Sequence, residues 1–372
     1  MTEAFKDQTS FAFDSQDKVY EYVRLMCDSA LFFLSQPSVP DPRLAAADQF
    51  FGGNALRWRK LVWGVRARNL NHLTAKSSYN PDLVIAACDS SMTTAADNAS
   101  VPYDGTVTGN TNFYGVLRDN LRGLRNSAFM ASLLNGTNPA TLGYRDPRSA
   151  SMLPIASTDS IIRGAEPGVG AAGTVLNPWG TTTVLPTHQG RYIFANTARF
   201  PIMTSFEIAF IRAEAQYRKG NKTVALADYK RAIDQHIDFV NGYAQLNPAT
   251  TPTITSATKT AMLADIRLVP VSADSLNIRK IMNQKYIANF GWNHVETWTD
   301  LRRYRYNAGI FDGRNVYTLT IPIILFNENA GRVAYRLRPR FNSEYVWNRE
   351  SLAKIGGLDN DYHCKEMWFM QP

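Results

Sequence analysis

The strongest periodic pattern in the chain lies between residues 204 and 240 and predicts two amphipathic helices joined by a tight turn. Each helix carries an apolar stripe with the 3.6-residue helical period. The stripe residues are Phe206, Phe210, Ala213 and Tyr217, then Leu226, Tyr229, Ile233, Ile237 and Val240. Gly220 suits the left-handed residue that ends the first helix, and Asn221 suits a cap for the second. This pattern is typical of a tetratricopeptide-type hairpin, which needs neighbours to bury its apolar face.

Other segments with helical periodicity flank this hairpin on both sides. They predict helices over residues 17–36, 54–77, 81–90, 274–289 and 294–306. Between residues 91 and 201 the periodicity is scarce, and Gly, Asn, Thr, Ser and Pro dominate, apart from one helix expected within 117–136. A Thr- and Pro-rich connector is expected at Asn247–Lys259, and an extended segment over 311–372.

These observations predict a mostly α fold, with a tetratricopeptide-like helical hairpin scaffold, a loop-rich insertion and short strands. We expect a single domain over residues 1–372. Its parts are a helical scaffold at about 15–90 and 202–310, a ligand-facing insertion at about 91–201 and a C-terminal segment at 311–372. A loop-rich stretch this long between helical blocks is typical of a segment with a binding role.

Composition and charge exclude several classes of protein. The formal net charge is +8, but the basic residues form no long run and no nucleic-acid recognition motif, so we predict no nucleic-acid partner. The three cysteines form no C-x-x-C pair, which argues against a disulfide framework or a zinc site. No apolar run is long enough to span a bilayer, and the first residues lack a signal-peptide pattern.

The sequence contains no recognisable catalytic motif. Its five histidines are scattered, and phosphate-binding, nucleophile-elbow and zinc-protease motifs are absent. Glu207 and Glu214 share a predicted helix, where carboxylates pair with neighbouring helices more often than they act as a glycosidase acid pair. We therefore predict no catalytic residues, no metal site, no cofactor and no enzymatic activity.

Candidate ligand-binding residues are taken from the insertion, because loops on a rigid scaffold commonly carry binding. Trp179 lies between Pro178 and Gly180, outside any apolar periodic pattern. It could be exposed and stack on a sugar or a peptide side chain, or it could anchor the insertion to the scaffold. Further candidates are an aromatic pair and two hydrogen-bonding partners, Tyr114, Tyr103, Asn112 and Arg191.

Several segments, in the right order, resemble the SusD/RagB family of nutrient-binding outer-membrane lipoproteins of Bacteroidetes. The signature-like segment is PIMTSFEIAFIRAEAQYRKG. The other matching segments are QFFGGNALRWRKLVWGVRARNL (49–70), RDPR (Arg145–Arg148), QKYIANFGWNHVETWTDLRRYRY (284–306), RLRPRFNSEYVWNRESL (336–352) and KEMWF near the C-terminus. The chain departs from the family pattern in two places. Phe369 stands where a second Trp is usual, and the N-terminal signal and lipidation cysteine are missing.

The resemblance implies a cell-surface protein that captures an oligosaccharide and passes it to a SusC-like TonB-dependent outer-membrane transporter. It also implies outer-membrane localisation through an N-terminal lipid that this chain lacks. Two alternatives stay open: a peptide-binding member of the same family, and a helical-repeat adaptor that binds other proteins. A glycan-processing enzyme is a third reading, against which the missing catalytic motifs argue.

Overall fold

The computed structural model describes residues 10–37, 41–121, 123–155, 159–170, 173–179, 190–246, 251–322, 325–339 and 342–372. Helices dominate these residues, and the strands among them are few and short. The predicted fold class, a mostly α protein with a helical-hairpin scaffold, is confirmed. None of the described helices combines the length and the apolarity that crossing a bilayer requires.

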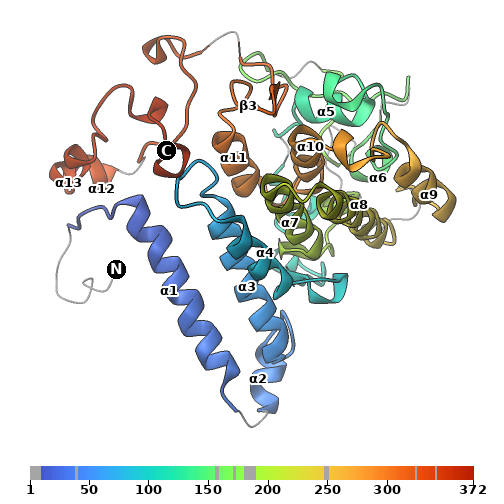
Figure 1. The fold of residues 1–372 in the computed structure, drawn as a ribbon, viewed down its shortest axis with the longest axis horizontal. Helices are drawn as coiled ribbons and strands as arrows, with labels where there is room; N and C mark the ends of the chain where they lie inside the picture. The colour runs from blue at the N-terminus through green and yellow to red at the C-terminus, as the bar shows by residue number, and fades with distance from the viewer. Residues whose placement is uncertain are drawn as a thin grey trace.

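The N-terminal helices form one side of the molecule, and α1 and α3 lie side by side along its length (Figure 1). Helix α3 packs on α1 and α4, and α4 packs on the central hairpin. The bounds are α1 Gln16–Ser35, α2 Pro42–Ala47, α3 Ala55–Asn71 and α4 Pro81–Asp89. The helices predicted at 17–36, 54–77 and 81–90 are therefore present, although α3 ends earlier than the pattern indicated.

The central hairpin consists of α7 (Ser205–Lys219) and α8 (Lys222–Ala244), which pack against each other along their length. Gly220 ends α7 with φ of 91°, in the left-handed region predicted for it. The prediction for Asn221 was wrong in its chemistry. Its side chain does not cap α8 but donates from Nδ2 to Gln216 Oε1 at 2.9 Å, back across the turn.

Helix α7 is buried on both sides, which its single apolar stripe did not predict. One face carries Phe206 and Phe210 into a core shared with α8, α10 and the insertion. The opposite face carries Ile208 and Ile211 into a second core shared with α3 and α4. A helix that is buried all round must sit inside the fold, so α7 is the element about which the scaffold is assembled.

The insertion begins and ends at a short antiparallel ladder. Strand β1 (Ala99–Val101) pairs with β2 (Phe200–Met203), which brings its two ends together directly before α7. The only α-helices among its described residues are α5 (Ala128–Asn135), within the predicted 117–136 range, and α6 (Ser149–Met152). Apolar side chains from both helices enter the same core as the hairpin, so the insertion is packed against the scaffold.

The C-terminal half adds three helices to the hairpin, and then a tail with little regular structure. The helices are α9 Ser256–Ala264, α10 Ile278–Ala288 and α11 His294–Arg303. Helix α9 begins inside the predicted connector, capped by Thr255 Oγ1, which accepts from the Thr258 N–H. The tail contains strands β3 Ile310–Phe311 and β4 Arg314–Asn315 and helices α12 Asn342–Val346 and α13 Arg349–Lys354.

A buried network of charged side chains joins the scaffold helices. Arg303 of α11 donates to both carboxylate oxygens of Glu214 on α7, at 2.8 and 3.0 Å, and to Asp300 at 2.6 Å. Asn71 of α3 donates to the same Glu214 at 2.9 Å, and Lys285 of α10 pairs with Asp300 at 2.8 Å. The network links α3, α7, α10 and α11.

We expect Arg303→Leu to destabilise the protein strongly, because it leaves the carboxylates of Glu214 and Asp300 buried without their shared partner. Removing one member of a buried ion pair costs about 3–5 kcal/mol of unfolding free energy. Urea denaturation measures this loss. Arg163→Leu is the matched control, because Arg163 pairs with Asp159 where both are about one-third exposed, and the loss should be far smaller than for Arg303→Leu. Equal losses would contradict the central role of Arg303.

Acid should weaken the same network. Burial alone would raise the pKa of Glu214, but the charge and hydrogen bonds of Arg303 outweigh it and hold that pKa well below its usual range. Such a carboxyl stabilises the fold above its unfolded pKa of about 4.3, and the stabilisation is lost as the pH falls. We expect the unfolding free energy to fall progressively as the pH drops below about 5 toward the depressed pKa of Glu214, and less steeply in Glu214→Gln. Identical slopes would argue against this origin.

Candidate functional site

A cavity of about 300 Å³ lies between the insertion and the turn that joins α10 to α11. Aromatic and aliphatic side chains form most of its wall, with a few polar groups among them. The residues that line it are Tyr114, Leu121, Leu124, Arg125, Asn126, Pro178, Phe194, Tyr286, Asn289, Phe290, Gly291, His294 and Thr297. An apolar wall with a small number of placed polar groups is the usual composition of a small-ligand site.

The turn after α10 is shaped by Gly291, and that shape brings the two sides of the cavity together. Gly291 has φ of 86°, a conformation that other residues rarely adopt. A Cβ atom there would lie 2.8 Å from Ile193 Cδ1 and 3.1 Å from Phe194 Cζ. The left-handed backbone therefore favours glycine at this turn, which places Asn289 and Phe290 against the insertion.

The aromatic rings of the wall pack against neighbouring rings in tilted and edge-to-face arrangements. Phe194 packs against Tyr114 and Phe290, with ring centroids 6.4 Å apart in both pairs. Tyr286 stands edge-to-face against Phe129, with centroids 5.0 Å apart. Such contacts fix ring orientations. Tyr114, Tyr286 and Phe290 are only partly buried, so part of their surface is available to a ligand.

Asn289 is the most unusual residue of the wall. Its side chain is 1% exposed, and neither its amide oxygen nor its amide nitrogen has a hydrogen-bond partner in the described part of the chain. A buried polar group without a partner costs about 1–3 kcal/mol. Buried polar groups are nearly always paired in folded proteins, so the unpaired amide sets Asn289 apart from the rest of the wall.

Some polar side chains of the cavity wall are hydrogen-bonded to the backbone of the insertion, and one is exposed to solvent. Arg125 Nε donates to the Val175 carbonyl at 2.9 Å, and Asn126 Nδ2 donates to the Arg163 carbonyl at 2.8 Å. These bonds tie Arg125 and Asn126 to two other backbone segments of the insertion, at Val175 and Arg163. His294, at the start of α11, is exposed. It is therefore the polar side chain of the rim that a ligand could reach most directly.

Trp179 is not exposed, contrary to one of the two readings of its sequence context. Its side chain is 2% exposed, and its Nε1 donates to the Tyr114 carbonyl at 2.9 Å. The indole lies in the main hydrophobic core together with Tyr192 and Phe194. This placement agrees with an anchor that ties the insertion to the scaffold, because a buried indole offers no open face for stacking.

Among the other predicted residues, only Tyr114 lines the cavity. Asn112 is fully buried and donates to the carbonyls of Ile193 and Ala198 at 3.1 and 2.7 Å. Arg191 donates to the Ala150 carbonyl at 2.7 Å, and burial lowers its pKa. Tyr103 is half-buried and lies outside the cavity wall. Direct ligand contact by these four remains a prediction.

The sequence reasoning missed the contribution of α10 and α11. Tyr286, Asn289, Phe290 and His294 all lie in the segment 284–306, which was interpreted as scaffold alone. The available signal was the Asn-Phe-Gly break between two helices, because a glycine after a helix end beside an aromatic residue is typical of a close backbone approach. The absence of partners around Asn289 is a tertiary feature that no sequence pattern reports.

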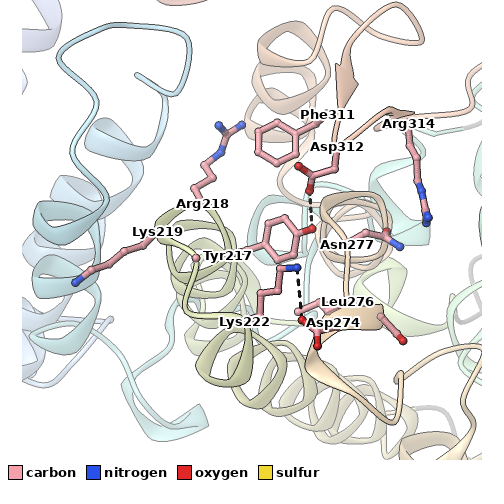
Figure 2. A pocket seen from close by; sticks show the side chains of 12 residues that line it. Tyr217, Arg218, Lys219, Lys222, Asp274, Leu276, Asn277, Phe311, Asp312 and Arg314 are labelled. Atoms are coloured by element: carbon pink, nitrogen blue, oxygen red, sulfur yellow. Dashed lines mark hydrogen bonds and ion pairs between the residues drawn. The ribbon is translucent and has the colours of Figure 1, made fainter.

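A larger cavity, of about 740 Å³, lies at the turn of the central hairpin. Figure 2 shows two pairs among its polar side chains: Tyr217 Oη donates to Asp312 at 2.5 Å, and Lys222 pairs with Asp274 at 3.6 Å. Lys219 points away from the cavity (Figure 2), and it pairs with Asp82. Because its wall carries fewer apolar side chains than that of the smaller cavity, we assign the candidate site to the smaller cavity.

The described ranges offer no metal cluster, and the smaller cavity has no carboxylate among the described residues of its wall. Within the described ranges, no group of three or more His, Cys, Asp or Glu side chains is placed to hold a metal ion. No aspartate or glutamate appears among the described residues that line the smaller cavity. Glycoside hydrolysis generally needs two carboxyl groups across the scissile bond, so this cavity is suited to binding rather than to hydrolysis.

Fold and site together define a helical-repeat scaffold that presents a ligand cavity. Residues 1–309 match a family model described as "Starch-binding associating with outer membrane". The chain belongs to this SusD-like family, as the sequence motifs predicted. The family consists of binding proteins rather than enzymes, and it is associated with the outer membrane. Among curated proteins, none matches this sequence.

Solved structures support the same fold. A SusD/RagB family protein from Bacteroides thetaiotaomicron is 22% identical, with a TM-score of 0.73 over 97% of this chain and 74% of that one. A SusD homologue from Bacteroides fragilis is 20% identical, with a TM-score of 0.67 over 97% and 76%. A chitin-binding SusD homologue from Flavobacterium johnsoniae is 17% identical, with a TM-score of 0.64 over 98% and 74%.

The buried position of Trp179 predicts a stability defect on truncation. We expect Trp179→Ala to lower the unfolding free energy by about 3–5 kcal/mol, since it removes a large core side chain. Trp347→Ala is the control, because Trp347 is 78% exposed, and it should change stability by less than about 0.5 kcal/mol. Thermal and urea unfolding measure both. A Trp179→Ala protein of unchanged stability that has lost ligand binding would instead restore the direct stacking role.

Proposed function

We propose that this protein captures an oligosaccharide at the cell surface and passes it to a SusC-like TonB-dependent transporter of the outer membrane. The observation that carries the proposal is the cavity between the insertion and the α10–α11 turn, where aromatic rings meet a few polar groups. Membership of a family described as starch-binding supports a glycan ligand, and so does the chitin-binding activity named for two proteins of similar fold.

The chemistry of the cavity suits a sugar. The faces of a sugar ring carry C–H groups that pack on aromatic rings, and Tyr114, Tyr286 and Phe290 offer partly exposed rings. Hydroxyl groups at the ring edge need hydrogen-bond partners, which His294 and Thr297 at the start of α11 can supply. A cavity of about 300 Å³ holds one or two sugar units, so a longer chain would extend out past His294.

In this proposal the protein releases the bound glycan without cleaving it. A carrier that hands its cargo onward must bind reversibly, and a cavity with no lining carboxylate among the described residues leaves the glycan intact. We further propose that a lipid on an N-terminal extension holds the protein at the outer membrane, as the motifs in the sequence imply. The helical face of the scaffold would then meet the transporter, with the insertion toward the ligand.

Two alternative functions, peptide binding and a protein–protein adaptor role, are distinguished by the same experiment. A peptide-binding member of the same family would use the same cavity, because aromatic rings and amides also bind peptides. A helical-repeat adaptor would instead bind a protein on its helices and show no affinity for glycans. The aromatic composition of the cavity, together with the family description, favours the oligosaccharide.

The proposal predicts measurable glycan binding that depends on the mouth of the cavity. Calorimetry on the purified chain, with a panel of oligosaccharides and peptides, should find an oligosaccharide that binds without turnover. Leu124 lines the cavity and is 55% exposed. Leu124→Trp should therefore obstruct it and weaken that binding by about ten-fold or more, equivalent to about 1.4 kcal/mol.

Leu83→Trp is the matched control, because Leu83 on α4 is also 55% exposed but lies outside the cavity wall. It should leave affinity unchanged. Glycan binding that is insensitive to Leu124→Trp would place the site elsewhere. Peptide binding alone would move the protein to the peptide-binding branch of the family, and silence toward both ligand classes would contradict capture by this chain.

A further inference from the structure

The unpaired amide of Asn289 carries information about the ligand. The amide group offers one acceptor and two donors, and none of them meets another described residue. Asn289 directly follows the last residue of α10 and lines the cavity at its junction with the insertion. The backbone at this position is held in place, since the Asn289 N–H donates to the Lys285 carbonyl at 2.9 Å. The protein thus keeps an unsatisfied, water-shielded amide in the wall of the cavity.

The surroundings of this amide restrict what could pair with it. The same wall carries apolar side chains from the turn and from the insertion, Phe290, Phe194 and Leu121. A ligand group that entered here with several hydroxyls would bury polar atoms without partners, which is costly. The wall therefore favours a group with one amide-sized polar part and an otherwise apolar surface.

We propose that Asn289 selects an oligosaccharide that carries an acetamido group, that is, an N-acetylhexosamine unit. The acetamido N–H would donate to Asn289 Oδ1, and the Asn289 amide nitrogen would donate to a neighbouring hydroxyl oxygen of the sugar. The acetyl methyl group would lie on the aromatic wall. Because the amide is shielded from water, ligand binding requires a side-chain rotation of Asn289 or of Phe290 beside it.

This inference rests on the proposed function, because it names the class of glycan that the same cavity would take. A binding site built to pair a polar substrate group rejects an analogue that lacks the group, since its own buried polar atoms then stay unpaired. The discrimination is therefore expected between sugars of the same linkage that differ only in the acetamido group.

The first test compares two trisaccharides by calorimetry on the wild-type chain. Triacetylchitotriose carries acetamido groups, and cellotriose has the same linkage with hydroxyls in their place. We expect triacetylchitotriose to bind at least about ten-fold more tightly, a ratio well within the reach of one satisfied buried amide. Equal affinities, or tighter binding of cellotriose, would overturn the inference. This comparison needs no variant, so it does not depend on the folding of a mutant.

The second test replaces the amide by an apolar group of similar size. Asn289→Leu should weaken triacetylchitotriose binding by about ten-fold or more, while its melting temperature stays equal to that of wild type or rises, because an unsatisfied buried group is removed. Asn283→Leu is the matched control on the same helix. Asn283 is also buried and its Oδ1 has no partner either, but its Nδ2 donates to the Arg279 carbonyl and it lies outside this cavity. It should lose stability and keep its affinity.

The outcomes separate this inference from the proposed function. If another oligosaccharide of the panel binds and Asn289→Leu does not affect it, the acetamido assignment is wrong while glycan capture stands. If a peptide binds instead and Asn289→Leu weakens it, the amide pairs with a peptide group and the sugar assignment is wrong. If no glycan binds at all, both the inference and the proposed function fail.

Discussion

The salt bridge between Glu214 and Arg303 is the interaction on which the rest of the structure depends. It lies inside the protein, is bidentate, and joins α7 to α11. Asn71 and Lys285 extend it to α3 and α10 through Glu214 and Asp300. A buried pair of this kind gains little net free energy over an apolar core, but breaking it is costly. It therefore acts as a geometric constraint that fixes how the helices meet.

That constraint positions the candidate site. Helix α10 packs on α7 and ends at Ala288. Helix α11 begins at His294, and Asp300 and Arg303 near its C-terminal end belong to the buried charge network. The short turn between them has little freedom to move. The insertion is tied down separately by the β1–β2 ladder and by buried Trp179. The cavity is thus formed between two parts that are each fixed to the same scaffold.

Local periodicity was enough to predict the scaffold helices, because their apolar faces and the Gly220 turn depend only on residues close together in the sequence. Features that depend on distant residues were not predictable. Helix α9 was missed because its Thr-rich composition resembles a connector. Trp179 has no local apolar pattern, yet the insertion folds over it. Asn289 looks like an ordinary helix-end residue, and its missing partners become evident only when α10 and the insertion are brought together.

The central claim is that an oligosaccharide occupies the cavity between the insertion and the α10–α11 turn. Hydrogen–deuterium exchange, with and without the tightest oligosaccharide found by calorimetry, tests it directly. The account predicts that added protection is confined to the segments of the cavity wall, residues 114–121, 123–126 and 286–297 and the neighbourhood of Pro178 and Phe194. Protection at residues 217–222 and 311–314, around the larger cavity at the hairpin turn, with none at 286–297, would contradict it.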